Sequence, residues 1–250
     1  MKELLNCAMD IGEQMLVCGA EVRRVEDSVK RICEALGAER TDVFIITSSM
    51  VVTTYYGDGE FYTQTRRIYA TGTDFEKIHR LNALSRRICH SPMTADEIRA
   101  ELTAIAATKA YPLWVEFVSY SIIAGAFTLF FGGGWVESLI SLVIGALVRL
   151  VILAADVTVE NKIFSKFIAS FVSTALAFTA LWTGLVPSVD MIIIGNIMTL
   201  IPGVGLTNAL RDLFTGDSIA GLLRSIEAVL VALAITAGYF LFAALGGVIG

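Results

Sequence analysis

The chain has 250 residues and a formal net charge of −5, with 19 basic and 24 acidic side chains, and 55% of its residues are hydrophobic. Charges of both signs are interspersed and no basic run exceeds two residues, which argues against a nucleic-acid-binding surface. Residues 1–111 hold 14 of the basic and 16 of the acidic side chains. Residues 112–250 are therefore much more apolar, and they need a lipid environment or an unusually large core.

All four cysteines lie in the charged half. They have no CxxC spacing and only two histidines as companions, so we interpret them as buried or reduced thiols and expect neither a metal nor a cofactor. The start of the chain, Met1–Leu4, is charged and lacks the apolar segment of a secretory signal peptide. We therefore expect the first half to stay in the cytoplasm.

The charged half reads as two helices followed by a β-rich segment. Residues 4–16 carry apolar side chains at helical spacing, and Gly19 is expected to end that helix. A second amphipathic helix is predicted over residues 22–36, with Gly37 closing it. Residues 42–67 are rich in Val, Ile, Thr, Tyr and Phe, which predicts three short antiparallel strands.

Two capping boxes predict that helices resume after the strands. In each box a threonine hydroxyl and a glutamate carboxylate satisfy exposed amides of the first helical turn. The boxes are Thr73-x-x-Glu76 and Thr94-x-x-Glu97, and the helices are predicted at roughly 74–90 and 95–109. Residues 1–111 are thus expected to form a small cytoplasmic α+β domain.

The apolar half contains five stretches that approach the roughly 20 apolar residues a helix needs to cross a hydrocarbon core about 30 Å thick. Trp114, Trp135 and Trp182 lie at the ends of these stretches, where aromatic rings suit the membrane interface. The sequence therefore predicts a membrane all-α bundle of about five transmembrane helices, formed by residues 112–250. The predicted spans are about 113–131, 136–155, 164–184, 189–204 and 222–246.

Basic residues in the short connections predict the orientation, because Lys and Arg are retained on the cytoplasmic side. Lys162 and Lys166 flank the second connection and Arg211 and Arg224 the fourth, whereas the first and third connections and the tail after Leu245 carry none. We expect a multi-pass protein of the cytoplasmic (inner) membrane. Its N-terminus is expected in the cytoplasm and its C-terminus outside.

The fourth predicted span is the least regular, because it has only about 16 residues and contains a Pro202-Gly203 break. Backbone groups freed by such a break need partners inside the protein, and short, interrupted helices often line a transport site. Alternatively, Pro202-Gly203 ends the helix at the interface. Arg149, about four turns into the second span, needs a carboxylate, a carbonyl or an aqueous cavity.

Two segments carry a resemblance to a known family. Ile201–Glu227, with the sequence IPGVGLTNALRDLFTGDSIAGLLRSIE, resembles the most characteristic segment of the threonine/serine exporter family. Cys18–Glu26, with the sequence CGAEVRRVE, resembles the N-terminal motif of the same family. In many members a transporter of about ten spans is divided between a larger subunit with a cytoplasmic domain and a small subunit of about five spans. This chain resembles the larger subunit, since it ends at Gly250 after the fifth predicted span.

The resemblance implies a subunit of a secondary transporter that exports small polar metabolites, threonine/serine-type amino acids above all. The implied partners are a second small transmembrane subunit, a small-molecule substrate and the lipid bilayer, with a higher oligomer as a further option and no nucleic acid. Arg, Asp, Glu and Asn suit a zwitterionic or dianionic solute. The family motif falls on Pro202, Gly203, Asn208, Arg211, Asp212, Gly216, Asp217, Gly221, Arg224 and Glu227, and on Gly19, Glu21, Arg24 and Glu26. Asn196, near the break, is a further candidate for the solute path.

Other functions stay open at this point. Split members of the family are also associated with dicarboxylate export, so a succinate-type exporter subunit is the first alternative. A membrane-anchored, hydrolase-like enzyme with Glu21, Arg24 and Glu26 as an acidic site is disfavoured, because no nucleophile lies at recognisable spacing from a base and no GxxxxGK[ST] loop is present. A scaffold that anchors a sensing domain does not account for the charged motif after the fourth span. We therefore predict a transporter and not an enzyme.

Overall fold

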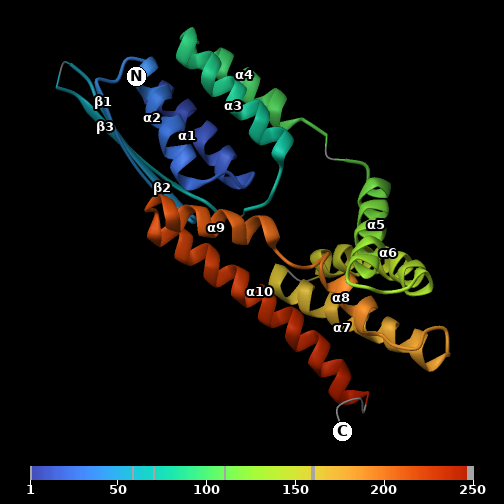
Figure 1. The fold of residues 1–250 in the computed structure, drawn as a ribbon. Coiled ribbons are helices and arrows are strands. Elements are labelled where there is room, and N and C mark those ends of the chain that lie inside the picture. The colour runs from blue at the N-terminus through green and yellow to red at the C-terminus, as the bar shows by residue number, and fades with distance from the viewer. Residues whose placement is uncertain (1, 58, 70, 110, 159–160, 247–250) are drawn as a thin grey trace. The chain divides into compact units, whose positions relative to one another are not determined.

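The structure, a computed structural model, describes residues 2–57, 59–69, 71–109, 111–158 and 161–246 (Figure 1). The chain folds as two compact units. Unit 1 comprises residues 1–109 and 204–225, and unit 2 comprises residues 110–203 and 226–250. The segment 204–225, which the sequence places with the membrane half, therefore packs with the charged domain.

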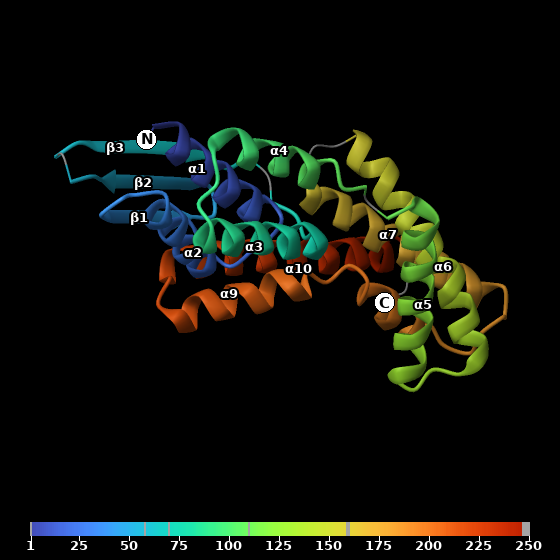
Figure 2. The same ribbon diagram turned by 90° about the horizontal axis from the view of Figure 1, so that it is seen from above.

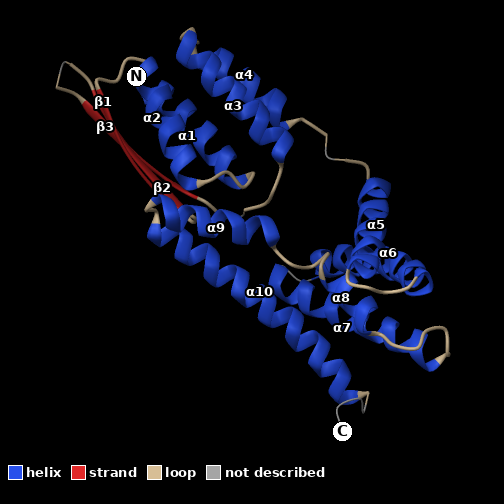
Figure 3. Ribbon diagram, viewed as in Figure 1, coloured by secondary structure: helices blue, strands red, loops and turns tan. Residues whose placement is uncertain are grey.

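Unit 1 contains a three-layer arrangement, with a sheet, a middle pair of helices and an outer pair of helices (Figure 2, Figure 3). The middle helix α1 is buried on several sides, with Leu5, Met9, Ile11 and Met15 all at most 2% exposed. This explains why α1 is more apolar than a surface helix. The layers consist of β1 (Arg40–Ile46), β2 (Ser49–Tyr55) and β3 (Phe61–Arg67), then α1 (Lys2–Val17) and α2 (Val22–Ala35), then α3 (Phe75–His90) and α4 (Ala95–Ala106).

The three predicted strands are confirmed as an antiparallel sheet in the order β1-β2-β3. Ile46 pairs with Ser49, so β1 and β2 are joined by a two-residue hairpin turn. In β2, Met50, Val52 and Thr54 are buried and alternate with half-buried residues, as expected for a strand with one face on the core. Asp58, between β2 and β3, lies outside the described residues.

The helix ends follow the predicted signals with one correction. Gly19 and Gly37 have φ values of +91° and +102°, which end α1 and α2 in a conformation that suits glycine. The capping box at Thr94 is confirmed. The box predicted at Thr73 is wrong, because Asp74 is the N-cap of α3 and accepts a hydrogen bond from the Lys77 amide at 3.0 Å. A carboxylate one residue later takes the capping position, so α3 begins at Phe75.

Among the described residues, four helices are long and apolar enough to cross a membrane. They are α5 (Leu113–Phe130), α6 (Trp135–Thr158), α7 (Lys162–Trp182) and α10 (Ser218–Leu245). The fourth predicted span, 189–204, is not a single helix. It contains only α8 (Asp190–Ile197), which is eight residues and about 12 Å long. A turn follows before Pro202, and α9 (Gly203–Thr215) begins beyond it.

Within unit 2, α8 packs closely against α5. A Cβ atom at Gly195 would overlap the Thr128 hydroxyl and lie 2.8 Å from the Ala124 carbonyl oxygen. Thr128 is hydrogen-bonded to Ser141 of α6 at 2.7 Å. Small side chains and buried hydroxyls of this kind are typical of helix packing in membranes, where they permit close backbone approach.

Candidate functional site

The two sequence segments that carry the family resemblance meet in unit 1, at the N-terminal end of α2. Asn208 Nδ2 of α9 donates to the Gly19 carbonyl oxygen at 3.2 Å, and Arg224 Nη2 of α10 donates to the Ala20 carbonyl oxygen at 2.9 Å. Arg211 Nη1 lies 2.6 Å from Glu21 Oε1. We call this contact the motif junction. It comprises residues 19–22 together with Asn208, Arg211, Asp212 and Arg224.

The centre of the motif junction is a buried ion pair between Asp212 and Arg224. Asp212 Oδ2 lies 3.1 Å from Arg224 Nη1, and the two side chains are 1% and 12% exposed. The Asp212 carboxylate also accepts a hydrogen bond from the backbone amide of Val22, the first residue of α2. Glu21, the N-cap residue, makes no side-chain capping bond. Asp212 therefore supplies the anionic acceptor that the start of α2 requires.

Backbone geometry at two glycines brings the three helices together. Gly216 has a φ of +98° and turns the chain between α9 and α10. Gly221 faces α9 so closely that an added Cβ would lie 2.8 Å from the Leu213 backbone nitrogen and 2.9 Å from the Ala209 carbonyl oxygen. These two positions place Arg224 directly against Asp212. A side chain at position 221 would collide with Leu213 and Ala209 of α9.

Two carboxyl groups near the junction are held in surroundings that disfavour their charge. Burial raises the pKa of Asp212, Arg224 opposes the shift, and the nearby Asp217 adds to it. Burial also raises the pKa of Glu26, although this side chain accepts a hydrogen bond from the Ile45 amide at 2.9 Å. Asp217 again adds to the rise. The region therefore has a higher affinity for protons than ordinary surface carboxylates.

The other predicted motif residues are directed elsewhere. Arg24 donates to Asn82 Oδ1 of α3 at 3.2 Å, and Glu26 contacts β1. Glu21, Arg24 and Glu26 thus have three separate partners and do not converge on one acidic site. Arg224 and Glu227 lie three residues apart on α10, a spacing that allows a pair on one helix face. Arg224 binds Asp212 instead, and Glu227 is exposed in unit 2.

Sequence reasoning missed two contributors to the junction region. Arg23 Nη1 donates to the Thr215 carbonyl oxygen at 3.1 Å, which places a cation at the C-terminal end of α9. Asn82 fixes Arg24 and itself donates to the Ile78 carbonyl oxygen at 2.7 Å. The role of neither residue could be predicted from the sequence, because their partners are distant along the chain or are main-chain atoms.

Unit 2 contains its own polar groups in the predicted spans. Arg149 of α6 donates through Nε to Glu116 of α5 at 2.8 Å, and its guanidinium lies 5.7 Å from the centre of the Tyr120 ring. Of the three partners expected for Arg149, a carboxylate, a carbonyl or an aqueous cavity, the structure shows the carboxylate. A cation in an apolar unit is stabilised by a carboxylate and an aromatic face together.

Asn196 of α8 is fully buried in unit 2. Its Nδ2 donates to the Ile192 carbonyl oxygen at 2.9 Å, while its Oδ1 has no hydrogen-bond partner among the described residues. Thr199 donates to the Asn196 carbonyl oxygen at 2.7 Å and so satisfies part of the backbone where α8 ends. Asn196 thus places an unpaired acceptor beside the break, separate from the motif junction.

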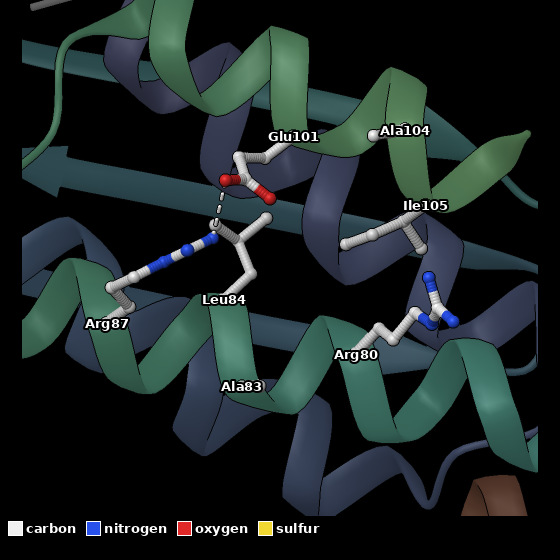
Figure 4. A pocket seen from close by; sticks show the side chains of 7 residues that line it. All are labelled: Arg80, Ala83, Leu84, Arg87, Glu101, Ala104 and Ile105. Carbon is white, nitrogen blue, oxygen red and sulfur yellow. Dashed lines mark ion pairs between the residues drawn. The ribbon is translucent and has the colours of Figure 1, made fainter. Parts of the chain in front are cut away.

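A hollow of about 330 Å³ lies between α3 and α4, away from the motif residues (Figure 4). The two arginines that line it form ion pairs. Arg87 Nη2 lies 2.9 Å from Glu101 Oε1, and Arg80 Nε lies 2.7 Å from Glu76 Oε1. Leu84 and Ile105 supply apolar lining. None of the predicted site residues lines this hollow, so we do not assign it to the candidate site.

Features that would favour catalysis are weak in unit 1. Cys18 is buried, and burial raises the pKa of its thiol, which opposes formation of a nucleophilic thiolate. Within the described part of the chain, no group of three or more His, Cys, Asp or Glu residues could hold a metal ion. The junction instead consists of ion pairs and main-chain hydrogen bonds that join three helices.

A charged α+β unit in one chain with four helices of membrane-spanning length and composition defines a multi-pass membrane protein. The chain belongs to the threonine/serine exporter family, ThrE, whose sequence profile matches residues 6–246. It is 26% identical over 94% of its length to a threonine/serine exporter from Corynebacterium glutamicum, of which it covers 50%. It is therefore related to transporters and embedded in a membrane.

Other relatives differ in length. The chain is 24% identical to the "Probable succinate transporter subunit YjjP" of Klebsiella aerogenes and covers 93% of that protein. It is also 24% identical to the pheromone-regulated membrane protein 10 of Eremothecium gossypii, of which it covers 32%. The chain thus spans half or less of some curated relatives and nearly all of another. No solved structure matches it.

Asp212→Ala is expected to destabilise the protein far more than Arg211→Ala. The first change leaves Arg224 buried without its carboxylate, which costs about 3–5 kcal/mol of unfolding free energy. The second removes a pair whose arginine is 63% exposed, and such pairs contribute at most about 1 kcal/mol. Thermal unfolding of the purified protein in detergent measures both. Equal losses of stability would contradict the central role of the buried pair.

Glu26→Gln is expected to change how stability depends on pH. Because the folded-state pKa of Glu26 is raised, the folded wild type binds this proton more tightly than the unfolded chain. Wild-type stability should fall as pH rises from the ordinary value of 4.5 through the raised pKa, and stay constant above it. The stability of the variant should not fall in this way. Its stability relative to wild type should therefore increase across the same pH range. Melting temperatures measured between pH 4 and about 8 test this, and parallel curves would refute it.

Proposed function

We propose that this chain is the larger subunit of a secondary transporter that exports small polar metabolites, with threonine/serine-type amino acids as the substrate class. It works with a second small membrane subunit. The observation that carries the proposal is the motif junction, because it joins the soluble unit to the helix that follows the broken fourth crossing. Its contacting side chains belong to residues on which the family motif falls, and they hold α9 and the start of α10 against residues 19–22.

The lengths of the relatives support a divided transporter. The chain covers half of the Corynebacterium exporter but nearly all of a relative whose name calls it a subunit. The remaining half of the longer relative then corresponds to a separate chain. The same comparison supports the second candidate function, a dicarboxylate (succinate-type) exporter subunit, since that relative is named for succinate.

The packing of α9 supports five crossings, although four helices in the described part of the chain are long enough to cross a membrane. If α5, α6 and α7 each cross the membrane, the chain leaves α7 on the side opposite unit 1. Arg211 nevertheless contacts Glu21 within unit 1, so residues 183–203 must return the chain to the first side. The fourth crossing is then made by α8 together with non-helical segments. Irregular backbone at this depth is tolerated where protein or a water-filled cavity surrounds it.

The broken crossing is where we place the solute path. Asn196 offers an unpaired amide oxygen that can accept a hydrogen bond from a hydroxyl or ammonium group. Pro202 and Gly203 separate α8 from α9, and interrupted helices of this kind line transport sites in other folds. Asn208, Arg211, Asp212, Asp217 and Arg224 form the cytoplasmic end of the path, and Glu227 follows one turn later on α10.

The proposed orientation places unit 1 in the cytoplasm. Lys162, Lys166, Arg211 and Arg224 then lie on the inner side of the cytoplasmic (inner) membrane, as retention of basic residues requires. Residues 1–111 and the loop that carries α9 are cytoplasmic, and the C-terminal end, whose last four residues lie outside the described range, is external. The rest of residues 112–250 forms the transmembrane part.

Export should depend on the exposed ion pair of the motif junction. Glu21→Arg and Arg211→Glu each place like charges together, and each should reduce efflux of threonine or serine from loaded cells that also express the second subunit. The double reversal should restore efflux, because opposite charges again face each other at the two positions, whose side chains approach to 2.6 Å in the native pair. Asp27→Arg, in an exposed pair on the same helix, is the matched control and should leave efflux unchanged.

Membrane levels are measured by immunoblot in each case. Full efflux from both single variants, or no recovery in the double variant, would remove the pair from the transport mechanism. Undiminished efflux without the second subunit would contradict the divided transporter. Succinate efflux in the same cells decides between the two substrate classes.

Reporter fusions test the fourth crossing. A phosphatase that is active only outside the cytoplasm should be active when fused after Gly184 and inactive when fused after Gly216 or Lys109. Gly132 provides a second external position, between α5 and α6. Activity after Gly216 would show that residues 183–203 do not return the chain to the side of unit 1.

A further inference from the structure

The helix α9 has its polar side facing the protein and its apolar side facing outward. Asp212 is 1% exposed and Asn208 is half-buried against α2, whereas Leu206 and Leu210 are more than 40% exposed. Phe214 is 86% exposed. Soluble units normally bury the apolar side of a surface helix. The outward side of α9 therefore requires an apolar cover.

The same kind of surface continues on α10. The exposed residues Ile219, Leu222 and Ile226 follow one another at helical spacing, and Leu230 and Leu233 extend the stripe along the same side. This helix has an 18-residue window of mean hydropathy 2.3 and qualifies as a membrane span. Exposed apolar side chains thus run along one side of α10, from its first turn into the part that qualifies as a membrane span.

We propose that the outward face of α9, together with the first turns of α10, is seated in the interfacial zone of the lipid bilayer. We call this surface the lipid-facing hairpin, formed by Leu206, Leu210, Leu213, Phe214, Ile219 and Leu222. An amphipathic helix at this level buries its apolar side by about 5–10 Å at the boundary between headgroups and acyl chains. The partner is phospholipid.

The length of α10 agrees with this depth. Its 28 residues extend about 42 Å, which exceeds a hydrocarbon core of about 30 Å by roughly two turns. If the core ends near Ile226, the first two turns of α10 lie at headgroup level. Because Gly221 holds α9 directly against these turns, α9 lies at the same level.

Cations at the edge of the hairpin also suit a phospholipid surface. The Arg211 side chain is 63% exposed and follows Leu210 on α9. Arg23 is exposed and donates to the Thr215 carbonyl oxygen at the end of the same helix. Arginines at this level meet lipid phosphates while neighbouring apolar side chains enter the acyl region.

Site-specific fluorescence on the full-length protein tests the proposal. Cys89 is the exposed cysteine, so Cys89→Ser provides a background in which Leu210→Cys or Phe214→Cys carries an environment-sensitive NBD label. Lys30→Cys, at an exposed site on α2, is the reference. The labelled proteins are placed in vesicles of phosphatidylcholine and phosphatidylglycerol. Quenching is then measured with doxyl-labelled lipids and with aqueous iodide.

At positions 210 and 214 we expect a blue-shifted emission, strong quenching by lipids with a shallow doxyl group and loss of iodide quenching. Position 30 should show the opposite. Iodide quenching at 210 and 214 equal to that at position 30 would overturn the proposal. So would protection from both quenchers, or protection that appears only with a second copy or the second subunit, since protein would then be the cover. A disulfide between two Phe214→Cys chains would identify a second copy as that cover.

Discussion

The buried ion pair between Asp212 and Arg224 is the interaction on which the architecture of unit 1 depends most. Removing both charges from water carries a desolvation cost that their mutual attraction offsets only with further hydrogen bonds. The structure supplies these, because Asp212 accepts from the Val22 amide and Arg224 donates to the Ala20 carbonyl oxygen. The pair therefore joins α2, α9 and α10 in one polar cluster. Without it, α9 would bury polar groups against the rest of unit 1 with no compensation.

The sequence predicted the elements of unit 1 more fully than their contacts. Apolar spacing gave α1 and α2, and β-branched composition gave the three strands, because both signals are local. The N-cap of α3 was misplaced by one residue, since Thr73 and Asp74 are both good caps and only the three-dimensional backbone decides between them. The contact between Glu21 and Arg211 could not be predicted, because 190 residues separate them and each also suits a solvated surface.

In the membrane half too, local features of the sequence predicted the helices but not the contacts between distant residues. Four of the expected spans correspond to long helices because an apolar run of sufficient length needs no partner to be recognised. The ends of the predicted span 189–204 could not be identified in this way. The sequence shows a Pro-Gly break there but does not show which part stays helical. The resemblance identified the residue types at 208, 211, 212 and 224. It did not indicate that they would contact residues 19–22, at the start of α2.

The motif junction and the proposed lipid-facing hairpin both involve the short helix α9. Residues 198–202 separate α8 from α9, and Pro202 lies directly before the first residue of α9. Transmission between sites requires an element with two arrangements that both sites can bias. Protonation of the Asp212 carboxyl group would remove its attraction for Arg224, while the bond from Arg224 to the Ala20 carbonyl oxygen would persist. The junction would then loosen without separating, and the contact between α9 and the start of α2 would change.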